Sequence, residues 1–237
     1  MGTSAYRIIF VVGASLMGVS FLGGAAHAVL TRHRLPELGA GPLSEGTERL
    51  EAGDLAGATR EFRLAAAIHP AEPRVLIRLA RTLEKAGDLR GADDAYARLQ
   101  RVRPLSAEGP AGRARMLLRA GRVDEAAPLA ARAVQLEPNN PEALVCLAEV
   151  RLEQNRHSDA AIAYARALQL QPGNAEVHNH LGIAYALQGR YDQAIEQFKA
   201  ALAISAGEQF RANLLRAQQE RTRAAAAAAP PPAGTPP

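Results

Sequence analysis

The sequence predicts an all-α solenoid of stacked helix pairs, and three observations support this fold class. The first is a 34-residue internal repeat, held without insertion five times from about residue 39 to residue 206. The second is the spacing of apolar residues within each repeat, which places them on one face of each helix. The third is composition. Aromatic residues make up only 4% of the chain and Trp is absent. Thin layers that close on Ala and Gly need less bulk than one globular core.

The clearest copy of the repeat runs from Ala175 to Ala206 and reads as two helices joined by a tight turn. Apolar residues follow helical spacing on both sides of Gly189, which breaks the pattern. The small residue Gly182 lets the two helices approach closely, while Tyr185 and Phe198 fill the space between them. Such a unit cannot bury its apolar faces alone, so neighbouring copies are expected to lie beside it.

Residues of the same kind recur at each 34-residue step. The small residue of the second helix is Ala58, Ala92, Ala126, Ala160 and Ala194. The aromatic position holds Phe62, Tyr96, Ala130, Tyr164 and Phe198. The closing position holds Pro70, Pro104, Pro138, Pro172 and Ala206. The turn position holds Gly53, Gly87, Gly121, Asn155 and Gly189. Asn, like Gly, tolerates a left-handed backbone, so the same turn is expected in every copy.

This pattern resembles the tetratricopeptide (TPR) family, whose 34-residue repeat is a helix–turn–helix unit. The resemblance implies a right-handed solenoid of five repeats, at 39–72, 73–106, 107–140, 141–174 and 175–208. It also implies that the first helix of each repeat lines a concave surface. The chain departs from the family pattern at the usual Trp position, which holds Pro42, Leu76, Pro110, Leu144 and His178. The family's Leu-Gly pair is present only as Leu181-Gly182.

A charge-free apolar segment follows a short head, residues 1–7, and spans residues 8–30. Its length suits a transmembrane anchor, which needs about 20 residues. The alternative is a signal peptide cleaved after Ala28, because Ala26-His27-Ala28 has the form of a cleavage site. A linker at 31–41 leads to the repeats.

An anchor and a signal peptide would both place the repeats outside the cytoplasm, although the Arg32-His33-Arg34 cluster favours the opposite orientation. The Ala- and Arg-rich composition suggests a bacterium, so we expect an inner-membrane protein with periplasmic repeats. A soluble periplasmic protein and cytoplasmic repeats remain alternatives.

The first helices of the second and third repeats are rich in Arg. One interpretation is a solvated face with acidic partners such as Glu84. The other is a basic groove for an acidic or carboxylate-bearing peptide, since the Arg guanidinium binds carboxylates in two places. Groove-side candidates in the last two repeats include Glu149, Glu153 and His180, which makes that end more acidic. The predicted contact residues are Arg74, Arg78, Arg81, Arg115, Arg119, Asn179 and Ile183.

The remaining segments carry three further predictions. Glu45 and Arg49 replace apolar residues in the first repeat, which suits an end repeat. Gly109-Pro110, Gly112 and Pro128 should shorten or bend the third repeat and create a local hinge. A helix at 207–229 should cap the solenoid through Phe210, Leu214 and Leu215, and a disordered Pro-rich tail is expected at 230–237.

The chain lacks the sequence motifs of catalysis and of cofactor binding. It has no Gly-rich phosphate loop, no Gly-x-Ser-x-Gly, no His-Glu-x-x-His and a single cysteine, Cys146. His178 and His180 diverge on a helix, so a metal site is not expected, and His178 should pack in the Trp position. The net charge of +4 comes from dispersed Arg, so nucleic acid is not an expected partner.

We therefore expect a non-catalytic scaffold or adaptor of the bacterial cell envelope, without cofactor or metal. Its concave groove would bind a peptide or helix of a protein partner. The alternatives are a self-associating structural solenoid and an accessory subunit of a membrane enzyme complex.

Overall fold

The computed structural model describes residues 41–228, and this part of the chain consists of eleven α-helices without any strand. The first helix of each pair is α3 (Pro42–Glu51), α5 (Pro73–Lys85), α7 (Glu108–Arg119), α9 (Pro141–Glu153) and α11 (Ala175–Ala186). The second is α4 (Leu55–Ile68), α6 (Leu89–Val102), α8 (Val123–Leu136), α10 (His157–Leu170) and α12 (Tyr191–Ile204). A single long helix, α13 (Glu208–Ala228), follows the last pair.

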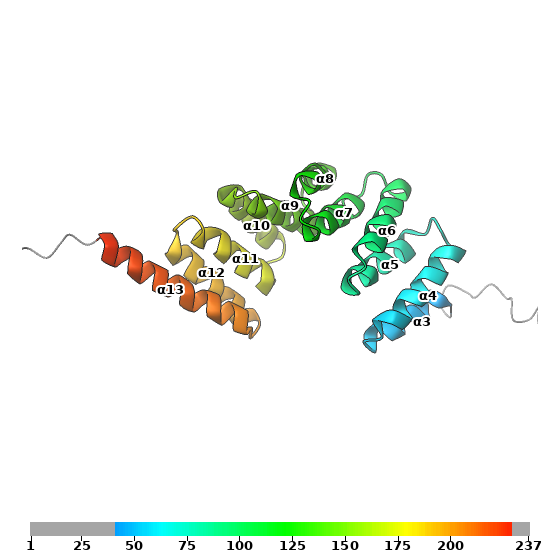
Figure 1. Cartoon of the computed structure of the whole chain (residues 1–237), viewed down its shortest axis with the longest axis horizontal. Coiled ribbons are helices and arrows are strands. Elements are labelled where there is room, and N and C mark those ends of the chain that lie inside the picture. Colours follow the sequence, from blue (N-terminus) through cyan, green and yellow to red (C-terminus); the bar gives the residue numbers. More distant parts are fainter. Residues whose placement is uncertain (1–40, 229–237) are drawn as a thin grey trace, which may run out of the picture.

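The helices stack in chain order and form an extended arch with α7, α8 and α9 at its top (Figure 1). Each helix packs mainly on the helices that precede and follow it in the sequence. Two further contacts join α7 to α9 and α11 to α13. The described residues therefore form the predicted all-α solenoid, in which each pair is stabilised by its neighbours.

The turns within the pairs have one backbone geometry. The turn residue has a positive φ in all five pairs: 79° at Gly53, 80° at Gly87, 74° at Gly121, 58° at Asn155 and 72° at Gly189. This confirms the turn position predicted from the 34-residue spacing. Five of the described helices begin with a side-chain cap, because a carboxylate or amide oxygen of the preceding residue accepts a backbone N–H bond. These caps are Asp54, Glu72, Asp88, Asn140 and Asn174.

The core lies between the two helices of each pair and between adjacent pairs. The repeated small residue is fully buried in every copy, at Ala58, Ala92, Ala126, Ala160 and Ala194. Aromatic side chains are buried in four pairs, at Phe62, Tyr96, Tyr164 and Phe198. A Cβ atom at Gly182 would lie 2.6 Å from the Phe198 ring, so this glycine is required for close helix approach.

The third pair is continuous, although it carries the glycines and proline that predicted a hinge. Helix α7 has 12 residues, the same length as α11 and one fewer than α5 and α9. A Cβ atom at Gly112 would lie 2.4 Å from the Tyr96 ring, so Gly112 admits the aromatic ring of the preceding pair. The predicted shortening of the helix is therefore slight, and the hinge itself stays a prediction about motion.

One contact compensates for the unusual sequence of this pair. Helix α7 has no cap of its own, but Glu137 Oε1 accepts a hydrogen bond from the backbone N–H of Ala107 at 2.8 Å. Hydrogen bonds from Asn140 and Ala107 lower the pKa of Glu137 below its usual value. Pro128 lies inside α8, which continues on both sides of it.

Helix α13 covers the last pair, as predicted for a capping helix. Phe210 and Ala217 are buried against α11 and α12, and Leu214 packs beside them. The prediction was wrong for Leu215, whose side chain is 55% exposed. Adjacent residues of a helix point about 100° apart, so Leu215 is turned away from α12 when Leu214 packs against it.

The predicted head, apolar segment and most of the linker, residues 1–40, lie outside the described residues, as does the predicted tail at 230–237. Among helices of the described part, none combines the length and hydrophobicity needed to cross a bilayer. The prediction of a transmembrane or signal segment at 8–30 therefore stays a prediction.

Candidate partner-binding groove

The first helices of successive pairs, α5, α7, α9 and α11, line a continuous series of depressions. We call the one between α5, α7 and α9 the arginine depression; it is lined by Arg81, Glu84, Lys85, Arg115, Arg119 and Glu142. We call the one between α7, α9 and α11 the glutamate pocket; its lining includes Arg115, Glu142, Val145, Glu149, Glu176 and His180. The first helices of these four pairs therefore form a groove that polar and charged residues line.

Two of the predicted arginines are held by a single carboxylate from the preceding pair. Arg115 Nε lies 2.9 Å from Glu84 Oε1, and Arg119 Nη1 lies 3.6 Å from the same oxygen. Tyr96 Oη donates a hydrogen bond to the other oxygen, Glu84 Oε2, at 3.1 Å. Burial raises the pKa of Tyr96 to about 12, so the phenol stays protonated and acts as donor. This network joins the second and third pairs.

Arg81 forms an ion pair that skips a repeat. Its Nη2 lies 3.0 Å from Glu142 Oε2 on α9 and 3.9 Å from Glu108 Oε1 on α7. The side chain can pass over α7 because Ala111 and Gly112 present little bulk at that point. Sequence reasoning did not find this pair, since its partners are separated by 61 residues.

Arg74 and Arg78 differ from the other three predicted arginines. Both side chains are exposed on α5, and within residues 41–228 neither forms a salt bridge or a side-chain hydrogen bond. Their guanidinium groups are therefore available to a partner. The sequence left two interpretations open, a face with acidic partners and a basic groove. The first describes Arg81, Arg115 and Arg119, which pair with glutamates. The second still applies to Arg74 and Arg78, which form an exposed basic surface.

Asn179 and Ile183, the two predicted contact residues on α11, lie close to α13. Asn179 is buried, and its Oδ1 accepts a hydrogen bond from Asn213 Nδ2 at 2.9 Å. Ile183 lines a cavity of about 240 Å³ together with Leu187 and Ala217. Both residues therefore lie where the capping helix meets the last pair, away from the arginine depression.

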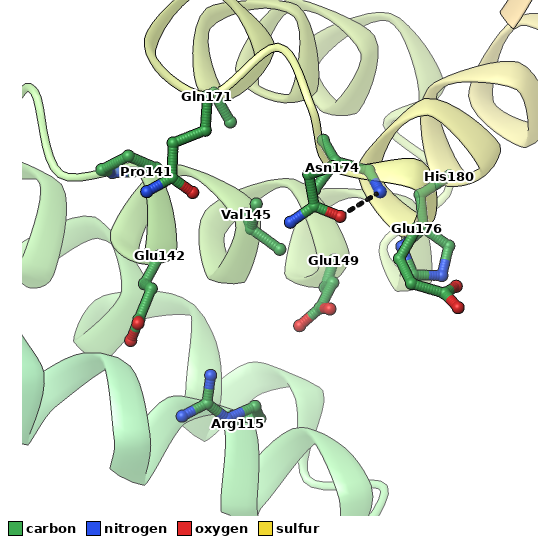
Figure 2. A pocket seen from close by; sticks show the side chains of 11 residues that line it. Arg115, Pro141, Glu142, Val145, Glu149, Gln171, Asn174, Glu176 and His180 are labelled. Carbon is green, nitrogen blue, oxygen red and sulfur yellow. Dashed lines mark hydrogen bonds between the residues drawn. The ribbon is translucent and has the colours of Figure 1, made fainter. Parts of the chain in front are cut away.

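The glutamate pocket is shown from close by in Figure 2, where Glu142 and Glu149 point from α9 toward Arg115 on α7. Glu176 and His180 project from α11 on the other side. The Glu149 carboxylate has no salt bridge and no hydrogen bond within the described residues. Burial raises its pKa, and the nearby Arg115 charge opposes that rise. Glu149 is thus a carboxylate without a partner at the centre of the groove.

Behind this pocket, two further polar groups have no hydrogen-bond partner among the described residues: His180 Nδ1 and the hydroxyl of Tyr164. The two rings lie against each other with their centroids 5.7 Å apart. Burial lowers the pKa of His180, which favours the neutral imidazole. Burial and the charge of Glu149 raise the pKa of Tyr164, so the hydroxyl keeps its proton.

The sequence had indicated Glu149 and His180 as groove-side residues but had not singled out Glu142, Glu176 or Tyr164. A signal for two of these was present, because Glu108, Glu142 and Glu176 are spaced by 34 residues and each stands second in its repeat. His178 is half-buried, and its ring nitrogens lie 2.8 Å from Gln197 Oε1 and 3.1 Å from the Pro172 carbonyl oxygen. His178 therefore packs at the position expected for it.

The described residues contain no cluster of side chains that could hold a metal ion. Cys146 is buried, and its Sγ donates to the Ala111 carbonyl oxygen at 3.4 Å. Burial raises the pKa of this thiol to about 12, so the nucleophilic thiolate is not formed near neutral pH.

Comparison with known proteins identifies the repeats. Two family models, both described as tetratricopeptide repeat, match residues 117–165 and 146–208. No curated protein sequence matches the chain.

Solved structures share the fold at low sequence identity. TTC0263, a thermophilic TPR protein from Thermus thermophilus, has 23% identity and a TM-score of 0.64, and the match covers 75% of this chain and 97% of that protein. MamA has 23% identity and a TM-score of 0.54, covering 69% of this chain and 89% of its own. YrrB, described as a TPR protein with an unusual peptide-binding site, has 17% identity and a TM-score of 0.53, covering 73% and 88%. Residues 117–208 thus carry tetratricopeptide repeats, and the described chain has the all-α fold of a tetratricopeptide solenoid.

Proposed function

We propose that this chain is a non-catalytic scaffold whose groove binds a peptide or helix of a protein partner. The observation that carries this proposal is the pair of exposed, unpaired arginines on α5, Arg74 and Arg78, on the same line of helices as the depressions. TPR proteins generally mediate protein–protein interactions, and the structural relative YrrB is described as having a peptide-binding site. Arg74 and Arg78 lie outside the lining of both depressions, so they would extend the groove along α5 with cationic groups, at the end opposite the carboxylates of the glutamate pocket.

The packing of the solenoid supports this function energetically. Glu84 pairs with Arg115 and Arg119, and Glu142 pairs with Arg81, so these contacts join different helix pairs. A surface that is ordered before the partner arrives loses less conformational entropy on binding. Extended peptides and amphipathic helices are the partners that grooves of this kind accept.

The test of the groove uses charge reversal at its unpaired arginines. In Arg74→Glu/Arg78→Glu, capture of a partner by the full-length protein should fall at least tenfold, because two attractive charges become repulsive. The matched control is Arg90→Glu/Arg132→Glu, which reverses two exposed arginines on the second helices α6 and α8. Arg81 is left intact, since its reversal would break the ion pair with Glu142.

The partner can be trapped with a photo-crosslinking residue at position 78, using position 162 as the comparison. Ile162 is 63% exposed on the second helix α10 and lines none of the groove depressions described above. A protein crosslinked from position 78 and not from position 162 would support the groove. Capture that persists in Arg74→Glu/Arg78→Glu would place binding elsewhere.

We further propose that the chain is attached to, or exported across, a bacterial inner membrane with its repeats in the periplasm. The support is the charge-free stretch at 8–30 and the Ala26-His27-Ala28 sequence that follows its most apolar part.

Protease accessibility of a C-terminal tag tests this location. Digestion after the outer membrane is made permeable would support periplasmic repeats, whereas protection until the inner membrane is lysed would overturn the proposal. The mass of the mature N-terminus separates the two forms of the segment. An intact Met1 indicates an anchor, and a start at Val29 indicates a cleaved signal peptide.

A further inference from the structure

We propose that the glutamate pocket between α7, α9 and α11 binds the side-chain ammonium of a lysine on the partner segment. This inference rests on the proposed function of the groove and adds the chemistry of one contact. It also sets the orientation of the bound segment along the groove. The lysine would lie toward α11, and any acidic group of the same segment would lie toward Arg74 and Arg78 on α5.

The pocket has more negative than positive side chains, which favours the binding of a cation. Three carboxylates, on Glu142, Glu149 and Glu176, line it together with one cation, Arg115. Glu142 already faces Arg81, and Arg115 already faces Glu84. Glu176 accepts only from the neutral amide of Gln209, at 3.2 Å. The charges of Glu149 and Glu176 therefore have no counterion within the described residues.

An independent observation comes from polar groups that lack partners beside this pocket. Tyr164 is fully buried, yet its hydroxyl has no hydrogen-bond partner among the described residues. The equivalent residue two repeats earlier, Tyr96, donates to Glu84 and accepts from Arg115. Tyr164 does not itself line the pocket, but its ring lies against His180, which lines it together with Glu149. Buried polar groups are normally paired, so these unpaired groups indicate a missing component.

The missing component is a donor, because Glu149, His180 and Tyr164 can each accept a hydrogen bond. Arg115 Nε, a further buried polar atom at the pocket without a hydrogen-bond partner, is a donor, but its charge already faces Glu84 Oε1 at 2.9 Å. The Glu149 carboxylate, the neutral ring of His180 and the hydroxyl oxygen of Tyr164 each offer lone pairs. An alkylammonium carries three N–H donors and no acceptor. It therefore complements this set, whereas a carboxylate would be repelled by it.

The size of the pocket points to a single side chain. Its volume is about 170 Å³, below the range of roughly 300–1,000 Å³ that is usual for small-molecule sites. Val145, Ala167 and Val177 supply apolar lining. The methylene stem of a lysine can lie along such a surface while its charged end reaches the carboxylates.

The experiment uses two small probes with the full-length protein. Nα-acetyl-lysine N-methylamide carries the ammonium, and Nα-acetyl-norleucine N-methylamide has a similar stem without the charge. Binding is followed by nuclear magnetic resonance of the histidine imidazoles, of which the chain has six. The lysine probe should shift the His180 signal saturably, and the norleucine probe should bind at least tenfold more weakly. Equal responses to both probes would overturn the proposal.

A pair of variants locates the site. Glu149→Gln should weaken binding of the lysine probe about tenfold, because it removes a charge-assisted hydrogen bond to the ammonium. Glu153→Gln is the matched control, since Glu153 is exposed one turn further along α9 and lies outside the pocket lining. Unchanged affinity in Glu149→Gln, in a protein whose melting curve shows it folded, would also overturn the proposal.

Failure of this inference and failure of the proposed function give different results. A protein crosslinked at position 78, together with no response to the lysine probe, would remove the lysine pocket and retain the groove. A specific response to the lysine probe, together with capture that is indifferent to Arg74→Glu/Arg78→Glu, would retain the pocket and remove the basic contact.

Discussion

Glu149 shows at the scale of one residue how a binding groove can reduce stability. Its carboxylate is half-buried in the groove and has no ion-pair partner within the described chain, although Arg115 lies across the pocket. Burial raises its pKa above the usual value, which means that the folded state holds the proton more tightly than the unfolded state does. Ionising Glu149 therefore costs folding free energy, and a bound cation would remove that cost.

This reasoning predicts a pH-dependent effect of Glu149→Gln. Because the folded-state pKa is raised, the penalty is absent below the unfolded pKa of about 4.3, grows as pH rises, and is complete above the folded pKa. The Gln variant should therefore melt at a higher temperature than the parent protein at about pH 7, and the difference should shrink toward about pH 4. Thermal melts at both pH values check this, with Glu153→Gln as control. Equal melting temperatures at neutral pH would contradict it.

Individual contacts were predictable from the sequence where they repeat and unpredictable where they do not. The turn residues, including Asn155, and the buried alanines follow from spacing alone, because every pair requires the same close approach. The ion pair of Arg81 with Glu142 does not repeat. It depends on the small residues of the intervening helix, and a 34-residue pattern contains no information about side chains that reach past a neighbour.

At the scale of helices, the third pair shows that a sequence feature can have two structural meanings. Gly112 suggested a weak helix, because glycine inside a helix costs about 1 kcal/mol. In the structure, it lies against the ring of Tyr96, so its lack of a side chain is needed for packing. The sequence could not distinguish these meanings, since the contact joins two different pairs. Pro128 has no such role and is exposed on α8.

Replacing this proline tests whether it weakens the third pair. Pro128 has no backbone N–H, so it cannot donate to the carbonyl of Asp124 one turn earlier. Pro128→Ala should restore that bond and raise the free energy of unfolding by about 1–3 kcal/mol, with slower amide hydrogen exchange in α8. Urea denaturation and hydrogen exchange measure the two effects. The control is Pro141→Ala at the first position of α9, where proline costs a helix little.

Amide hydrogen exchange of the parent protein also tests the prediction of a hinge in the third pair. If α7 and α8 exchange as slowly as α9 to α12, the third pair is not a hinge, and Pro128→Ala should then have little effect on stability.

At the scale of the whole molecule, the solenoid separates stability from recognition. Each pair contacts its neighbours, so stability is a sum of local terms and does not depend on one central core. The groove runs along the first helices and changes from basic on α5 to acidic on α9 and α11. The sequence predicted the row of pairs and this polarity. It could not predict the arch of Figure 1, which results from small packing differences at each pair.

Because each helix pair is stabilised by its neighbours, the contribution of the capping helix α13 to the stability of the last pair can be measured by removing it. Removing residues 207–237 would uncover Phe198, Ile195 and Ala201, which α13 now helps to bury. Losing the buried Phe210 alone should cost about 3–5 kcal/mol. The truncated protein should therefore be less stable, and hydrogen exchange should speed up in α11 and α12 while α3 to α6 change little. Its uncovered face should also drive self-association that increases with concentration.

Light scattering over a range of concentrations, combined with hydrogen exchange, measures both effects, and removal of residues 230–237 alone is the control. A truncated protein that stays monomeric with unchanged exchange in α11 and α12 would show that α13 is not a cap.

The same light-scattering series on the full-length protein tests the alternative function of a self-associating structural solenoid. Self-association of the full-length chain would support that alternative, and its loss in Leu215→Glu would place the contact on the outer face of α13, where Leu215 is exposed. A monomer at every concentration would leave the groove as the surface on which recognition depends.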